Sequence, residues 1–346
     1  METERANPLH GCITADELRS IVFPPEQWLI NNVIYSEGFC FIYGAEGTGK
    51  SFVTLSLAQA VSSGTDWLGH FKVPQASKVM FIDKENPMSM LARRVKGLGL
   101  AGENISWVRC PESLQLTDGK GNISPFAQAL ADKAEAEEIG LIVIDSFIDL
   151  IAGNENVAGD TQVFFDTMRK LFPQKAILVL HHENKPAPGV FRNDAQRTRG
   201  SSNINAQTVT QFRLEAVAKS KTELTLKQTK ARDAQKLDKF MIRMVVEPDG
   251  ESTKVTGFEY VGVVAETEDV QKIEEAALIV QEVLADSGSV RRQEIITACN
   301  GRGISERTIV SALKKLVSTG QLIVEKVGRY SLYSWVGAVK TEESEE

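Results

Sequence analysis

The octapeptide Gly44-Ala45-Glu46-Gly47-Thr48-Gly49-Lys50-Ser51 contains the residue types that bind phosphate, and it fits the pattern G-x-x-x-x-G-K-[ST] at every position. Glycines here let successive backbone N–H groups point into one concavity, and a helix that begins there adds its positive N-terminal end. Lys50 can reach the outer phosphates of a nucleotide, and the Ser51 hydroxyl can ligate Mg²⁺. The octapeptide therefore predicts a nucleoside triphosphate site with Mg²⁺.

The segments on either side of the octapeptide fit a phosphate-binding loop. Residues 39–43 form an apolar run of strand length, and residues 52–63 carry a helical pattern that ends at Gly64. The alternative is a glycine-rich structural turn, which does not require a strand before it and a helix after it. The combination favours the phosphate-binding loop.

Asp145 is the candidate for a second metal ligand. It follows residues 141–144, four apolar residues of a predicted buried strand. Open α/β sheets bind ligands at the carboxyl ends of their strands, so Asp145 is placed to hold Mg²⁺ through water, opposite Ser51. Apolar runs that end in Asp are common, and the prediction depends on the phosphate-binding loop that precedes this one.

Hydrolysis also needs a group that orients the attacking water. Residues 79–82 form the apolar strand that follows the phosphate-binding loop and its helix. Glu85 lies just past the end of this strand, where a carboxylate base can act. Asp83 is the competing candidate. Glu85 can instead be a loop carboxylate at the start of the next helix.

Two histidines end the strand predicted over residues 176–180. A polar side chain at this point can contact the γ-phosphate and report its loss to the following loop. Neighbours at a strand end point to opposite faces, which argues against a metal pair. We expect His182 to be the phosphate sensor and His181 to be structural; the alternative is that both are ordinary polar residues at a strand end.

Strand-length apolar runs alternate with helical segments from residue 37 to 260, and the runs are 39–43, 78–83, 106–109, 141–145 and 176–180. This alternation predicts an α/β fold with a mostly parallel twisted sheet covered by helices. Later runs at 208–214, 223–229 and 241–246 follow one another without long helices. They predict meander strands that extend the sheet.

The C-terminal part of the chain has a different pattern. Helical spacing over 273–285, a short helix over 291–299 and a third helix over 305–317 precede two strand-like arms, 321–327 and 330–335. Three helices and a two-stranded wing are typical of a small α+β winged helix-turn-helix domain.

The predicted winged helix is locally basic, since residues 287–336 hold eight Lys or Arg against three Glu. Winged helices usually bind duplex DNA through the third helix, whose outward cations here are Arg307, Lys314 and Lys315, with Arg329 at the wing tip. Many winged helices bind proteins instead, and that alternative stays open.

The ordered series of motifs resembles the RecA-fold P-loop ATPases, most closely the RepA-like group of plasmid and phage replicative helicases. The motifs that carry the resemblance are Pro25-Glu26-Gln27-Trp28-Leu29, the octapeptide, Ser62-Ser63-Gly64-Thr65-Asp66-Trp67-Leu68-Gly69, Phe81-Ile82-Asp83-Lys84-Glu85-Asn86-Pro87, Ile144-Asp145-Ser146, Gly153-Asn154-Glu155-Asn156, His181-His182-Glu183-Asn184-Lys185, Arg199-Gly200-Ser201-Ser202 and Lys230-Ala231-Arg232. We expect a RecA-like ATPase domain over 37–262, preceded by a segment packed on it (1–36). A linker (263–271), the winged helix (272–337) and a disordered acidic tail (338–346) follow.

The resemblance implies ATP as the nucleotide, Glu85 as the catalytic glutamate and His182 as the sensor. It also implies a homo-oligomeric ring, typically a hexamer, with ATP between subunits. The Lys/Arg pair that completes the site from the neighbouring subunit falls on Lys230 and Arg232. An arginine finger there would stabilise transition-state charge. The alternative for this pair is a solvated turn.

Residues 186–202 form a long polar loop that follows the predicted sensor and contains Arg192, Arg197 and Arg199. Loops of this kind line the central channel in the related family and follow the backbone of single-stranded DNA. A flexible loop whose arginines serve solubility is the alternative. Residues 154–156 are a weaker candidate for contact with DNA.

The composition argues against several other classes of protein. A formal net charge of −7 argues against a uniformly basic nucleic-acid binder, although it is compatible with local basic surfaces. No stretch approaches a membrane span, and no apolar signal-peptide core follows the N-terminus. The cysteines Cys12, Cys40, Cys110 and Cys299 are far apart, which argues against a zinc site or a disulfide framework. A cytoplasmic protein is the expectation.

The order of the motifs predicts a ring-forming DNA motor that uses ATP and Mg²⁺, translocates on single-stranded DNA and serves replication of a plasmid, phage or mobile element. A replication initiator or a primase is a candidate partner. The alternative is an ATP-switched DNA-binding regulator or loader, in which the winged helix binds duplex DNA and no unwinding occurs. A kinase is a weaker third interpretation, because the sequence shows no evident acceptor pocket and the Lys230/Arg232 match argues against it.

Overall fold

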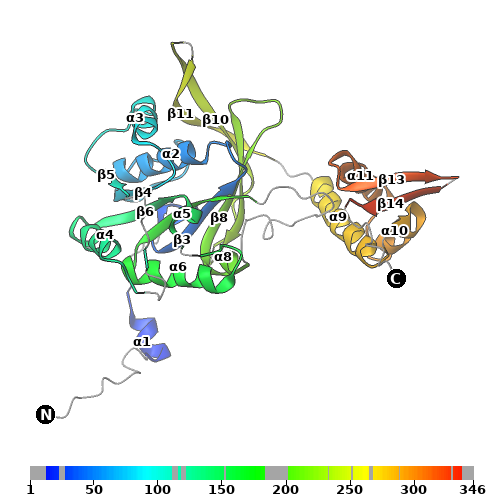
Figure 1. Ribbon diagram of the computed structural model, residues 1–346, viewed down its shortest axis with the longest axis horizontal. Helices are drawn as coiled ribbons and strands as arrows, with labels where there is room; N and C mark the ends of the chain where they lie inside the picture. The colour runs from blue at the N-terminus through cyan, green and yellow to red at the C-terminus, as the bar shows by residue number, and fades with distance from the viewer. Residues whose placement is uncertain are drawn as a thin grey trace, which may run out of the picture.

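A nine-stranded sheet forms the centre of the computed structural model, which describes residues 13–22, 28–110, 116–117, 122–151, 153–183, 202–232, 234–250, 252–264, 268–287, 289–328 and 330–336. The strand order is β11-β10-β9-β8-β3-β7-β6-β4-β5. The five pairings from β8 to β5 are parallel, and the three from β8 to β11 are antiparallel. Figure 1 shows helices on both sides of this sheet.

The strands of the large sheet are β3 (Gly38–Gly44), β4 (Lys78–Asp83), β5 (Ile105–Arg109), β6 (Ile139–Asp145), β7 (Ala176–His182), β8 (Thr208–Ala216), β9 (Glu223–Ala231), β10 (Phe240–Asp249) and β11 (Ser252–Val263). The parallel strands are buried on both faces, which explains why β6 and β7 have nearly continuous apolar sequences. The predicted α/β fold with a mostly parallel sheet is confirmed. A small hairpin of β1 (Trp28–Ile30) and β2 (Ile34–Tyr35) precedes the sheet.

Two hydrophobic cores lie on the two faces of the sheet, and β3 contributes to both. Cys40 and Ile42 belong to the core that contains the apolar side chains of α2 (Lys50–Ser63). Phe39 and Phe41 belong to the opposite core, which also receives side chains from α4 (Pro125–Ala136), α5 (Phe147–Leu150), α6 (Ala158–Leu171) and α8 (Ser202–Gln207). This alternation is the period-2 geometry of a strand with two buried faces.

The sequence does not predict β11, which pairs with β10 in a hairpin that stands out from the sheet in Figure 1. The register of the hairpin shifts at Met241/Ile242 and at Val245/Val246. Such bulges interrupt the alternation by which a strand is recognised in a sequence. The helix α3 (Met88–Gly97) packs on β11 so closely that a Cβ at Gly97 would lie 2.8 Å from the Val255 carbonyl oxygen.

The C-terminal module, residues 268–336, has its own core and its own small sheet. Its elements are α9 (Glu268–Ser287), β12 (Ser289–Arg291), α10 (Arg292–Asn300), α11 (Glu306–Ser318), β13 (Leu322–Val327) and β14 (Tyr330–Trp335). The three predicted helices are present, although the first begins five residues earlier than predicted. The small sheet has one strand more than the two predicted, because β12 pairs with β14 and gives the order β12-β14-β13.

The N-terminal helix α1 (Ala15–Ser20) buries none of its residues, and Figure 1 shows it standing away from the sheet. A capping box caps its N-terminus, and in it the Thr14 side chain accepts a hydrogen bond from the Glu17 backbone N–H. None of the helices in the described part of the chain is long and apolar enough to cross a membrane.

Candidate nucleotide site

The carboxyl ends of four parallel strands bring the predicted site residues to one edge of the sheet. Gly44 at the end of β3 is in register with His182 at the end of β7, and Asp83 at the end of β4 is in register with Asp145 at the end of β6. The edge encloses a cavity of about 200 Å³. Its lining includes Glu46, Gly47, Gly49, Lys50, Ser51, Phe52, Glu85, Asn86, Arg94, Asp145, Ser146 and His182.

The glycines of the phosphate-binding loop are required by its backbone. Gly47 and Gly49 have φ angles of 73° and 85°, which side chains other than glycine rarely adopt. At Gly44 the requirement is steric, since a Cβ would lie 2.4 Å from the Leu214 carbonyl oxygen of β8. Helix α2 begins directly after Gly49, so its N-terminal end faces the loop.

Lys50 is buried beneath the loop, and its Nζ donates to the carbonyl oxygens of Gly44 at 3.1 Å and Ala45 at 2.9 Å. Burial lowers the pKa of this ammonium, while the carboxylates of Asp145 and Glu85 oppose the shift. Two loop carbonyls therefore hold a desolvated positive charge at the place where phosphate oxygens would bind.

Ser51 and Asp145 meet although they are 94 residues apart in the sequence, with Ser51 Oγ donating to Asp145 Oδ2 at 2.8 Å. The peptide bond between Asp145 and Ser146 is cis. A hydroxyl and a carboxylate are the oxygen ligands that Mg²⁺ prefers, so the pair fits the ion. No group of three or more His, Cys, Asp or Glu side chains with metal-binding geometry occurs among the described residues. Mg²⁺ held by Ser51 and Asp145 would neutralise phosphate charge.

Glu85 and Asp83, the two candidates for orienting the attacking water, differ in their hydrogen bonds and exposure. Oδ1 of Asp83 accepts hydrogen bonds from the backbone N–H groups of Glu85 at 3.1 Å and Asn86 at 2.9 Å, and its carboxylate also accepts from Asn86 Nδ2. Asp83 is thus buried and engaged in shaping the turn. The exposed Glu85 lines the cavity, where its carboxylate is available to a water molecule.

Arg94 and Asn86 belong to the site, although the sequence analysis gave neither a role. Arg94 Nη1 donates to Asn86 Oδ1 at 3.0 Å, and its guanidinium lies 5.1 Å from the centre of the Phe52 ring. Asn86 Nδ2 in turn donates to Asp145 Oδ2 at 3.3 Å. Arg94 lies on α3, eleven residues after Asp83 in the chain, and only the packing of that helix shows which of its cations enters the cavity.

The two histidines at the end of β7 face opposite sides of the sheet, as the strand geometry predicts. His182 lines the nucleotide cavity. His181 is buried in the opposite core, edge-on to the rings of Phe41 and Phe147. The placement of His182 is compatible with a sensor, and that of His181 with a structural role.

Lys230 and Arg232 lie at the edge of the sheet opposite the nucleotide cavity. The start of β8 lies beside the start of β3, with Phe39 opposite Thr208. Because β9 runs antiparallel to β8, the end of β9 returns to this same edge, with Ala231 opposite Thr210. The pair is therefore separated from the nucleotide cavity of the same chain by the length of the strands.

Both cations of this pair contact carbonyl oxygens of α8. Lys230 Nζ donates to the carbonyl oxygens of Asn205 and Ala206, and Arg232 Nη2 donates to that of Ala206 at 2.9 Å. Burial, followed by the neighbouring Arg232, lowers the pKa of Lys230 to about 8. The pair is thus attached to the helix that directly follows the segment for which a DNA-contact loop is predicted.

The structure describes only some of the residues that are predicted to contact DNA. Arg192, Arg197, Arg199 and Arg329 lie outside the described residues. Arg307, Lys314 and Lys315 are exposed on α11. Lys315 Nζ lies 3.4 Å from Glu274 Oε1 on α9. Two cations of α11 thus have no ion pair among the described residues.

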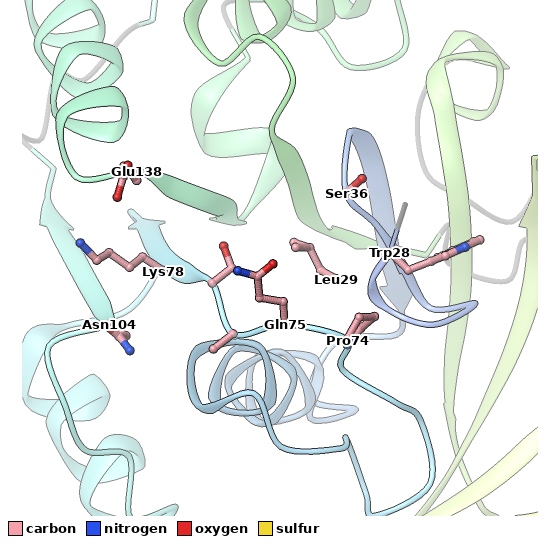
Figure 2. Close-up of a pocket in the computed structure, with 10 residues that line it drawn as sticks. Trp28, Leu29, Ser36, Pro74, Gln75, Lys78, Asn104 and Glu138 are labelled. Atoms are coloured by element: carbon pink, nitrogen blue, oxygen red, sulfur yellow. The ribbon is translucent and has the colours of Figure 1, made fainter. Parts of the chain in front are cut away.

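A larger hollow of about 540 Å³ lies at the opposite edge of the sheet (Figure 2). Lys78 is the first residue of β4, and Glu138 directly precedes β6. Figure 2 shows the Lys78 and Trp28 side chains extending to opposite sides, so the ends of the labelled side chains do not converge on a common point. The described residues that line this hollow include no glycine-rich loop and no helix N-terminus, which are the features that bind phosphate at the other edge.

A family model described as AAA domain matches residues 3–188, and one described as PaaX-like protein matches residues 276–338. No curated protein matches the chain. Among solved structures, the flagellar accessory protein FlaH from Methanocaldococcus jannaschii is 14% identical, with 67% of this chain and 92% of that chain covered and a TM-score of 0.41. A DnaB-like replicative helicase, described with its interactions with primase, is 12% identical, with 60% and 55% covered and a TM-score of 0.44.

No residue role is transferred from these two structures, because the likeness is distant. The family match covers more than half of the chain and includes the phosphate-binding loop, Glu85, Asp145 and His182. The parallel sheet carries all of them at its carboxyl edge. The chain therefore belongs to the AAA domain family and is a P-loop ATPase built on a mostly parallel α/β sheet.

Proposed function

We propose that the protein is a ring-forming, ATP-dependent DNA motor, a replicative helicase of the RepA-like kind from a plasmid, phage or mobile element. The proposal rests on one observation: the residues predicted to take part in hydrolysis lie at two opposite edges of the sheet. The nucleotide groups lie at the carboxyl edge, whereas Lys230 and Arg232 lie at the opposite edge. A head-to-tail assembly of identical subunits brings such surfaces together, and it forms a ring when the rotation between subunits closes.

In the proposed mechanism Lys50 and the loop N–H groups bind the phosphates, and Glu85 orients the attacking water. Ser51 and Asp145 would hold Mg²⁺, which would neutralise charge on the phosphates. Arg232, with Lys230, enters from the next subunit and stabilises the charge that develops on the transferred phosphoryl group.

His182 detects loss of the γ-phosphate and passes the change to the loop that follows it. That loop contains Arg192, Arg197 and Arg199 and would hold the backbone of single-stranded DNA. The contacts of Lys230 and Arg232 with α8 support this coupling, because α8 begins where the loop ends. We propose a hexameric ring, with an initiator or a primase as a partner.

A second candidate function is an ATP-switched regulator or loader that binds duplex DNA. It is favoured by the order helix, strand, helix, helix, strand, strand in the C-terminal module, which is the order of a winged helix. It is also favoured by the exposed cations Arg307 and Lys314 on α11. In this function ATP controls assembly and no strand displacement occurs.

A forked duplex with one single-stranded tail distinguishes the two functions. The motor is expected to separate the strands only with hydrolysable ATP, to hydrolyse ATP faster with single-stranded DNA, and to form a larger species with nucleotide than without it. A non-hydrolysable analogue is the matched control. Duplex-specific binding, with ATP hydrolysis indifferent to single strands and no strand separation, would contradict the motor and favour the regulator.

The Mg²⁺ requirement of the ATPase is expected to depend on pH through Asp145. Burial raises the pKa of this carboxyl to about 7, and the charges of Asp83 and Glu85 act in the same direction. Below pH 7 a bound proton must leave before the metal binds. The Mg²⁺ concentration for half-maximal hydrolysis should rise about tenfold for each pH unit below 7 and level off above it.

The measurement is a Mg²⁺ titration of hydrolysis at pH 6, 7 and 8. Asp145→Asn is the control, because it removes this carboxyl and shows how much of the pH dependence comes from the nucleotide itself. A Mg²⁺ requirement that changes with pH equally in both proteins would contradict the role of Asp145.

A further inference from the structure

Glu155 is a buried acidic residue that the mechanism above does not use. Its side chain is 3% exposed, and its Oε2 lies 3.8 Å from Nε2 of His181. A buried carboxylate is unfavourable unless a partner compensates the loss of water. The same loss of water strengthens its interaction with a neighbouring imidazole. An apolar side chain of similar size would fill this place at a lower desolvation cost than a carboxylate. Packing alone therefore does not explain why a carboxylate is buried here.

The turn that carries Glu155 is built by its neighbours. Gly153 has a φ of 133°, and a Cβ there would lie 2.3 Å from Asp160 Oδ2. The same Asp160 oxygen accepts a hydrogen bond from the Asn154 N–H at 2.7 Å. Asn154 Oδ1 accepts from the backbone N–H and the Nδ2 of Asn156, each at 2.9 Å. The surrounding contacts thus define the backbone from which Glu155 points inward.

His181 lies beneath the strand ends that form the nucleotide site. The centre of its ring is 6.2 Å from that of Phe41 and 5.0 Å from that of Phe147. Phe41 belongs to the strand that leads into the phosphate-binding loop, and Phe147 is two residues after Asp145. His181 is followed directly by His182. The imidazole therefore packs between the strand that leads into the phosphate-binding loop and the segment that follows Asp145.

We propose that Glu155 is a positioning residue for the sensor: through His181 it holds the end of β7, and so the direction in which His182 faces the outer phosphate. The proposal rests on the proposed function, which assigns His182 as the sensor. Glu155 is not among the residues that line the nucleotide cavity, and in this proposal it acts on His182 through His181. Because it belongs to the turn at 153–157, a displacement of that turn changes the orientation of His182.

The test uses basal hydrolysis by the full chain without DNA. Glu155→Gln keeps the size of the side chain and removes its charge. We expect kcat to fall about tenfold, while KM and the Kd of a non-hydrolysable ATP analogue change by less than about twofold. His181→Phe, which preserves packing against Phe41 and Phe147, should have the same effect. The exposed Glu103→Gln is the matched control and should be unchanged.

A double variant separates positioning from a general loss of structure. His182→Ala should lower kcat, and Glu155→Gln added to it should cause little further loss, because residues that act as one unit are not additive. Additive losses, or unchanged kcat in both Glu155→Gln and His181→Phe, would overturn this proposal alone. Unchanged hydrolysis in His182→Ala would instead overturn the sensor role in the proposed function.

Discussion

Lys50→Ala is expected to abolish ATP hydrolysis, with a loss of kcat/KM of at least about 100-fold. Its ammonium is buried beneath the phosphate-binding loop and is held by the carbonyls of Gly44 and Ala45. Alanine removes the charge from a desolvated place where water cannot replace it. The measurement is steady-state phosphate release, together with binding of a fluorescent nucleotide.

Lys78→Ala is the matched control for this substitution. Lys78 lines the larger hollow at the opposite edge of the sheet, and its side chain is exposed. It should hydrolyse ATP at the rate of the unmodified protein. Full turnover by Lys50→Ala would contradict the nucleotide site described here. If Lys78→Ala lost turnover and Lys50→Ala kept it, the nucleotide would be assigned to the larger hollow instead.

Arg232→Ala is expected to lower kcat about 1,000-fold in the assembled protein while leaving ATP binding unchanged. The reason is geometric, because Arg232 lies at the edge of the sheet opposite its own nucleotide cavity. In the assembly that we propose, it therefore stabilises the transition state of a neighbouring subunit. Arg243→Ala removes an exposed arginine from β10 and is the control for a general loss of positive charge.

Mixing the two inactive proteins gives the sharper test of a shared site. A subunit with Lys50→Ala still supplies Arg232, and a subunit with Arg232→Ala still binds ATP. In rings assembled at random from equal amounts, about a quarter of the interfaces contain both intact halves. Partial recovery of hydrolysis is expected on mixing. No recovery, although mixed assemblies form, would contradict a site completed from the neighbouring subunit.

Residues whose chemistry is contained in a few consecutive positions were predictable. The octapeptide supplies glycines with positive φ, a cation and a hydroxyl within eight consecutive residues. Asp145, Glu85 and His182 were predictable by a second rule, since parallel strands carry ligand-binding groups at their carboxyl ends. That rule specifies the edge of the sheet. It does not specify that Ser51 and Asp145 would meet at 2.8 Å.

Other features depend on contacts between segments that are distant in the sequence. Arg94 enters the site because α3 packs beside the turn after β4, and the helical pattern alone does not distinguish it from Arg93. Strand β11 was missed because two bulges interrupt the alternation of its hairpin. The burial of Glu155 against His181 follows from a turn closed by Asp160, which no local pattern specifies.

The chemistry of the nucleotide site was thus already present in the linear sequence, because phosphate binding is a local property of a loop and the helix that follows it. The arrangement of that chemistry was settled by the folded sheet. Strand order and direction place Lys230 and Arg232 at the edge opposite Lys50. This follows from pairing directions between strands, which the residues of a single segment do not encode. The same pairing makes a second subunit necessary for the complete site that we propose.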